Sequence, residues 1–136
     1  MEICCDIDKM VRHPDLRARY EAFEPEDDVV EALRAIDEKV TIAIIFGFWC
    51  PDSLTIVPRV LKSIVAADND NIQALAVSIP LDETHDLPID VGTVSVRRFP
   101  TTAILRGHYE KTEEIEPECE IVRFVEEPLD AARLAV

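Results

Sequence analysis

One cysteine in the middle of the chain has the surroundings of a reactive thiol. Cys50 follows the apolar, β-branched run 40–46, and Pro51 comes next, at the start of a segment with helical spacing. Proline suits the first position of a helix, so we expect Cys50 at the N-cap, where free backbone N–H groups and the helix dipole stabilise a thiolate. The thiolate is the form that attacks disulfide bonds. The sequence therefore predicts a nucleophilic Cys50, and the alternative is an ordinary buried cysteine.

The neighbours of Cys50 act on the sulfur in opposite directions. The hydroxyl of Ser53 is expected to donate a hydrogen bond to the thiolate, whereas the carboxylate of Asp52 disfavours a second negative charge nearby. We expect the helix N-terminus and its amides to outweigh Asp52. Trp49 and Phe48 could line a substrate surface, and Trp49 could equally be a packing residue.

A site with one thiol has restricted chemistry. Because Ser53 stands where a redox pair would need a second cysteine, Cys50 cannot close a disulfide with it, and a mixed disulfide must await an outside thiol or another cysteine of the chain. Cys119 is the candidate internal resolver, against the plainer interpretation of a half-buried cysteine at a helix start. Cys4 and Cys5 are assigned no role. The four cysteines and three histidines lack zinc-site spacing, so neither a metal nor a bound cofactor is expected.

The elements that position Cys50 follow from hydrophobic periodicity. Apolar spacing predicts, in order, helices over 14–23 and 25–38, a buried strand over 40–46, a helix over 51–67 and a buried strand over 72–79. A loop with room for a turn of helix follows over 80–98, then a hairpin over 101–115 turning at Gly107 and His108, and helix from residue 120 onward, interrupted at Pro128. This order indicates an α/β fold, in which a mixed central sheet is covered by helices on both faces. We expect one domain over 1–136, with residues 1–24 as an N-terminal extension that carries an extra helix.

Three motifs in order resemble the thioredoxin superfamily. The segment "FWCPDS" is similar to its W-C-x-x-C site, between the central strand and the next helix, and Pro58 matches the proline that kinks that helix. The stretch "VSVRRFPTTAILRGHYE", residues 94–110, resembles the part of the family that carries a cis-proline before a strand and a glycine turn. The resemblance covers roughly residues 26–127. It implies that Pro100 is cis and packs across from Cys50, and that the backbone at Phe99 accepts an extended peptide.

A closer resemblance is to thioredoxin-like proteins with a W-C-[GP]-D-S site, as in "GFWCPDSLTIVPRVLKSI". This resemblance favours Ser53 as the native residue. We expect a substrate surface formed by Trp49, Pro51, Asp52, Phe99, Pro100 and Thr101. One departure from ordinary thioredoxins is Ile44, six residues before Cys50, where those proteins place a buried aspartate that manages the proton of the second cysteine. Both that acid and the second cysteine are absent, and the two absences agree, because a buried acid without a partner is costly.

The expected function is thiol–disulfide exchange by a single reactive cysteine, with Cys50 and Ser53 as catalytic residues. The enzyme class is a monothiol oxidoreductase that forms mixed disulfides with proteins or small thiols. The main alternative is a redox-inactive binding module with the same fold. Iron–sulfur handling, by analogy with monothiol glutaredoxins, is less favoured because Asp52 adds charge at the site.

Composition excludes other classes of partner. The net charge is -14, from 28 acidic and 14 basic residues, so nucleic acid and anionic lipid would be repelled. No apolar run approaches the roughly 20 residues that cross a bilayer, and no secretory signal pattern is seen at the N-terminus. We therefore expect no nucleic-acid or membrane partner and a cytoplasmic location. The oligomeric state is left open.

Overall fold

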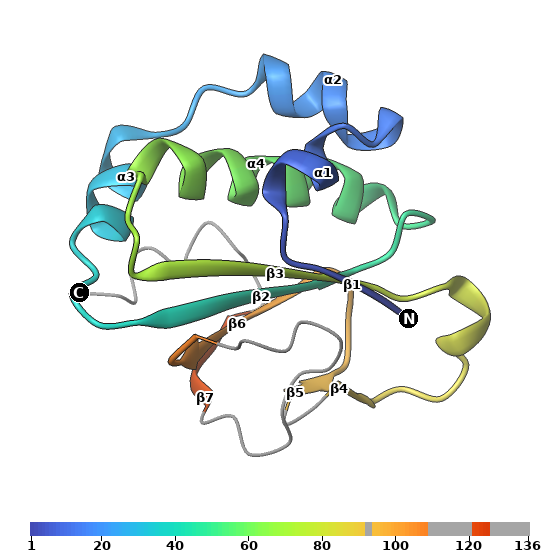
Figure 1. Cartoon of the computed structure of the whole chain (residues 1–136). Helices are drawn as coiled ribbons and strands as arrows, with labels where there is room; N and C mark the ends of the chain where they lie inside the picture. The colour runs from blue at the N-terminus through green and yellow to red at the C-terminus, as the bar shows by residue number, and fades with distance from the viewer. Residues whose placement is uncertain (92–93, 109–120, 126–136) are drawn as a thin grey trace.

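A five-stranded mixed sheet organises the part of the chain that the structure, a computed structural model, describes: residues 1–91, 94–108 and 121–125. The elements are β1 (Glu2–Cys4), α1 (Ile7–Val11), α2 (Pro14–Ala22), α3 (Asp27–Arg34), β2 (Val40–Phe46), α4 (Pro51–Ala67), β3 (Ile72–Ser78), a 3₁₀ turn η1 (Leu81–Glu83), β4 (Ile89–Val91), β5 (Val94–Val96), β6 (Thr101–Arg106) and β7 (Ile121–Val125). Figure 1 shows their arrangement.

The central strand of the sheet is β2. The strand order is β1-β3-β2-β6-β7, with β2 parallel to β3 and every other pair antiparallel. All seven residues of β2 are buried, as its unbroken β-branched and apolar sequence predicts for a strand covered on both faces. The predicted mixed α/β sheet is confirmed.

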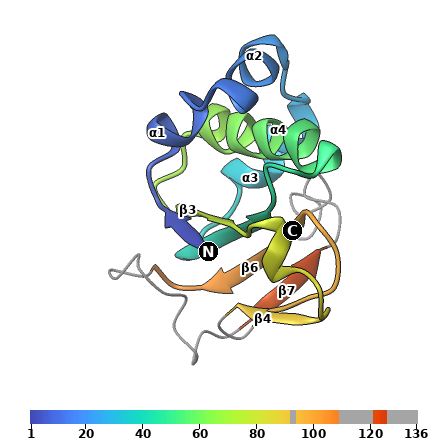
Figure 2. The same ribbon diagram turned by 90° about the vertical axis from the view of Figure 1, so that its right-hand side faces the viewer.

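The two faces of the sheet are covered differently. Among the described residues, α1 to α4 lie on one face and the short β4–β5 hairpin lies on the other (Figures 1 and 2). Alternation along β2 divides the core accordingly: Ile42, Ile44 and Phe46 pack with the helices, whereas Ala43 and Ile45 pack with the hairpin.

Two expectations for the later part of the chain need correction. Within residues 80–98, η1 agrees with the expected turn of helix, whereas the strands β4 and β5 stand where only loop was expected. Residues 121–125, expected to be helical, form β7, which pairs antiparallel with β6. Their sequence "IVRFV" is β-branched and aromatic, and pairing with β6 decides between the two possibilities. The expected second hairpin strand after His108 and the helix around Pro128 lie outside the described residues.

Helix α4 follows β2 after the short loop of residues 47–50. It runs from Pro51 to Ala67, the predicted bounds, and continues through Pro58. Its buried side packs against α2 and α3. The N-terminal extension contains two more elements than expected, because β1 and α1 precede the predicted helix α2. These two elements are three and five residues long, too short to show a reliable period.

Candidate active site

Cys50 occupies the junction between β2 and α4. It is the N-cap of α4, with extended backbone angles, and Pro51 is at the first helical position. Its N–H donates to Gly47 O at 3.0 Å, and its carbonyl accepts the Leu54 N–H at 3.2 Å. The loop of residues 47–49 and the first helical turn therefore fix the backbone of Cys50 from both sides, as expected from the sequence.

The sulfur of Cys50 does not point where we expected. No side-chain capping bond to the helix N–H groups is made, and Sγ instead donates to Phe99 O at 3.7 Å. The thiol is therefore directed toward the segment that precedes β6. Cys50 is 9% exposed, so its thiol lies just below the surface.

The segment opposite Cys50 is a sharp turn into β6. The Phe99–Pro100 peptide bond is cis, and the Thr101 hydroxyl donates to Arg98 O at 2.7 Å. Pro100 and the side chain of Thr101 are buried, whereas Phe99 is half-buried. The turn thus presents the Phe99 carbonyl to Cys50. Because the Thr101 side chain is enclosed, any contact that this residue makes with a substrate comes from its backbone.

Ser53 supports the loop before the cysteine. Its side chain is fully buried, and its hydroxyl accepts the Gly47 N–H at 3.3 Å. Among the described residues, this hydroxyl is hydrogen-bonded by the Gly47 N–H, whereas we expected it to donate to the Cys50 sulfur. Ser53 therefore ties the first turn of α4 to the end of β2.

Trp49 is partly exposed and also makes packing contacts. Its indole is 38% exposed, yet Nε1 donates to Ile79 O at 2.8 Å and the ring packs edge-on against Phe99 at 5.3 Å between centroids. Gly47 allows this placement, because a Cβ there would lie 2.4 Å from Trp49 Cε2. Sequence reasoning missed Gly47, although its place two residues before the Trp-Cys pair was a signal.

The remaining residues singled out from the sequence differ in how far solvent reaches them. Pro51 and Asp52 are exposed at the start of α4. Ile44 is fully buried in the helix-facing core, so an apolar side chain fills the place of the family's acid. Cys119 lies outside the described residues.

Metal and membrane features were searched in the described ranges. No group of three or more histidine, cysteine or acidic side chains there could hold a metal ion. Likewise, no helix within those ranges is both long and apolar enough to cross a bilayer.

Comparison with known proteins gives one match. A family model described as thioredoxin matches residues 6–129, more of the chain than the segment 26–127 whose motifs carried the resemblance. No curated protein and no solved structure gives a significant match.

Proposed function

Because this chain belongs to the thioredoxin family, whose general chemistry is thiol–disulfide exchange, we propose that it carries out this exchange with Cys50 as its single nucleophile. The observation that carries the proposal is the position of the Cys50 sulfur. It lies at the start of α4, 3.7 Å from the Phe99 carbonyl and beside the cis bond to Pro100. A disulfide that enters at the exposed face of Trp49 would meet this sulfur.

The reaction has two exchange steps. The Cys50 thiolate attacks one sulfur of a substrate disulfide, forms a mixed disulfide with it, and releases the other sulfur as a thiolate. An external thiol, as its thiolate, then attacks the mixed disulfide and releases Cys50 in its reduced form. Each step exchanges one S–S bond for another, so the protein itself gains and loses no electrons over the cycle. Protein disulfides and low-molecular-weight thiols are the proposed partners.

The roles of the neighbouring residues follow from their contacts. Ser53 accepts from Gly47, and its own O–H remains able to donate toward the sulfur when the thiolate forms. Attack would break the Sγ contact with Phe99 O, which frees that carbonyl to accept an N–H from an extended substrate. Trp49, Pro51 and Asp52 form the outer surface around the thiol, while Pro100 and Thr101 shape the turn beneath it.

The test is to trap the mixed disulfide. In a Cys4→Ser, Cys5→Ser, Cys119→Ser background, only Cys50 remains. This protein should react with oxidised glutathione to give one adduct by intact mass, and the adduct should persist until a thiol is added. The same background with Cys50→Ser should give none. Failure of Cys50 to form an adduct while the protein is folded contradicts the proposal.

A second variant tests the monothiol character. Ser53→Cys would create a C-x-x-C pair at the start of α4. In the same background, this variant should discard the bound glutathione by closing a disulfide between Cys50 and the introduced cysteine, visible as a loss of two hydrogens. An adduct that persists equally in both proteins would show that residue 53 does not determine the outcome.

One observation favours the alternative function, a redox-inactive binding module. Cys50 is only 9% exposed, and its S–H is engaged with Phe99 O, whereas an active nucleophile must be reachable. Alkylation by iodoacetamide across a pH series separates the two functions. A Cys50 that is alkylated much more slowly than a small free thiol at every pH favours the module, and faster alkylation at neutral pH favours the exchange reaction.

A further inference from the structure

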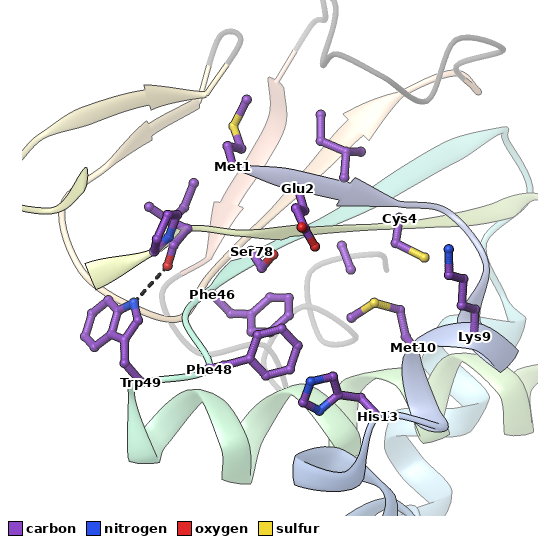
Figure 3. Close-up of a pocket in the computed structure, with 14 residues that line it drawn as sticks. Met1, Glu2, Cys4, Lys9, Met10, His13, Phe46, Phe48, Trp49 and Ser78 are labelled. Atoms are coloured by element: carbon purple, nitrogen blue, oxygen red, sulfur yellow. Dashed lines mark hydrogen bonds between the residues drawn. The ribbon is translucent and has the colours of Figure 1, made fainter. Parts of the chain in front are cut away.

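A pocket of about 620 Å³ lies beside the candidate active site, between the N-terminal segment and the helix-facing side of β3 (Figure 3). It is lined from β1 by Glu2 and Cys4, from α1 by Met10, and from the end of β2 by Phe46. Cys50 is not among its lining residues. The volume is within the range of about 300–1,000 Å³ that is typical of small-molecule sites.

The strand β3 explains why this space is hollow. On the helix-facing side it carries the small residues Ala76 and Ser78, where the neighbouring strand β2 carries Ile44 and Phe46. In the antiparallel pairing, Glu2 is opposite Ser78 and Cys4 is opposite Ala76, so the side chains of these pairs share one face. The edge strand β1 therefore extends the sheet as one wall of the pocket.

The polar groups at the pocket are mainly donors. His13 Nδ1 accepts the Asp15 N–H at 3.2 Å, so the neutral ring carries its proton on Nε2. The same ring stacks on Phe48, with centroids 4.1 Å apart. Within the described part of the chain, the Lys9 ammonium has no ion pair or hydrogen bond with another residue. Of the carboxylates, only that of Glu2 lines this pocket.

We propose that this pocket binds a small organic carboxylate with an aromatic body. The ring packs between Met10, Phe46 and Phe48, and the carboxylate lies at Lys9. An anion is favoured because the Lys9 ammonium lines the pocket and, among the described residues, has no ion pair. This binding does not depend on the exchange chemistry proposed for Cys50.

Trp49 provides the readout for this site. It is the sole tryptophan of the chain, and it lines the pocket while its ring also packs against Phe99. A ligand in the pocket should change its fluorescence. Backbone amide shifts in a ¹H–¹⁵N NMR titration should identify the same place, with the largest changes in β1, α1 and residues 46–49.

The probe is 3-phenylpropionate, compared with the uncharged 3-phenylpropanamide. We expect saturable binding of the carboxylate and weaker binding of the amide. Lys9→Gln should weaken the carboxylate by about threefold, because an exposed ion pair contributes modestly, and should leave the amide unchanged. Lys39→Gln, which removes the same charge from an exposed position outside the pocket, should change neither affinity.

A filling variant tests the position of the ligand. Ser78→Leu should abolish binding of both probes while the circular dichroism spectrum stays native. If this variant does not fold, the comparison of Lys9→Gln with Lys39→Gln decides alone. The proposal is overturned if neither probe saturates at millimolar concentration, if the shifts map elsewhere, or if the two lysine variants weaken binding equally.

Discussion

At the scale of single residues, the geometry around Cys50 depends on a position without a side chain. Gly47 receives the indole of Trp49 over its α-carbon, and its N–H and carbonyl hold Ser53 and Cys50, respectively. One glycine thus connects the tryptophan, the helix start and the thiol. Its role is a close approach of two groups, and no left-handed backbone angle is involved.

The variant Gly47→Ala should displace Trp49. A Cβ at 2.4 Å from the indole forces the ring outward, breaks its bond to Ile79 O, and lowers the free energy of unfolding by about 1–3 kcal/mol. The measurement is the emission maximum of the sole tryptophan, which should move to longer wavelength. Gly107→Ala is the matched control: nothing lies within 4 Å of its Cβ and its φ is +87°, so it should lose about 1 kcal/mol by backbone strain with unchanged emission. A native emission spectrum for Gly47→Ala would contradict the argument.

Two adjacent threonines of β6 should respond oppositely to removal of the hydroxyl. Thr102 is fully buried, and among the described side chains its Oγ1 is the one buried polar atom without a hydrogen bond. Thr102→Val should therefore raise the free energy of unfolding by about 1 kcal/mol, because a desolvated hydroxyl is replaced by a methyl group. Thr101→Val should instead lower it by about 1–3 kcal/mol, since the bond to Arg98 O is lost. Urea unfolding measures both, and equal losses would show that Thr102 has a partner.

At the scale of elements, the sequence predicts those parts whose periodic signal is long. The seven residues of β2 and the seventeen of α4 have the predicted bounds, because an unbroken apolar run and a proline at N1 are unambiguous. The strands β1, β4 and β5 have three residues each, and three residues cannot show alternation. We expected helix at β7 because the strand β6 that pairs with it lies in a different part of the chain and local periodicity does not reveal that pairing.

The burial of Tyr20 in α2 should be measurable as a change in the titration of its phenol. The pKa of Tyr20 is raised above its ordinary value, mainly because burial disfavours the phenolate and secondly because the Asp8 carboxylate repels it. The neutral phenol is thus favoured in the folded state. Its contribution to stability is fully present below the unfolded pKa of about 10 and is lost as the pH rises through the folded pKa.

Tyr20→Phe isolates this contribution, since phenylalanine does not titrate. The free energy of unfolding of the original protein should fall more steeply with rising pH above about pH 10 than that of the variant. Absorbance at the phenolate band should also show one fewer high-pH transition in the variant. Identical alkaline profiles would mean that α2 does not shield Tyr20 from water.

At the scale of the whole molecule, the excess of acidic residues dominates the electrostatics. The net charge is -14. The described ion pairs are exposed to solvent; in Arg17–Glu21, for example, the two side chains are 67% and 64% exposed. Pairs of this kind contribute about 0–1 kcal/mol each. We therefore expect self-repulsion of the folded chain to outweigh the attraction within the described ion pairs.

Sodium chloride should consequently stabilise the protein. The thermal midpoint should rise between low salt and roughly 0.3 M, where the Debye length has fallen below about 6–8 Å, and then level off. Differential scanning fluorimetry over a salt series measures this, with uncharged sucrose as the control for general solute effects. A midpoint that falls with salt would show that the ion pairs matter more than the net charge.

The candidate site was only partly predictable at this scale. The order Cys50, Pro58, Pro100 along the chain indicated the family, and the N-cap position of Cys50 followed from local rules. The direction of its sulfur did not, because it depends on the Phe99 carbonyl from a segment 49 residues away. The pocket beside Trp49 was also invisible, since it requires the pairing of β1 with β3.

The position of β1 has a consequence for how the protein is made. Its partner residues, Ala76 to Ser78, are translated long after residues 2–4, so a nascent chain carries its first strand without anything to pair with. The pocket is also lined by Ile79 and Pro80, which likewise leave the ribosome well after β1. The strand β1 is therefore synthesised before its partner and can pair only once β3 is present.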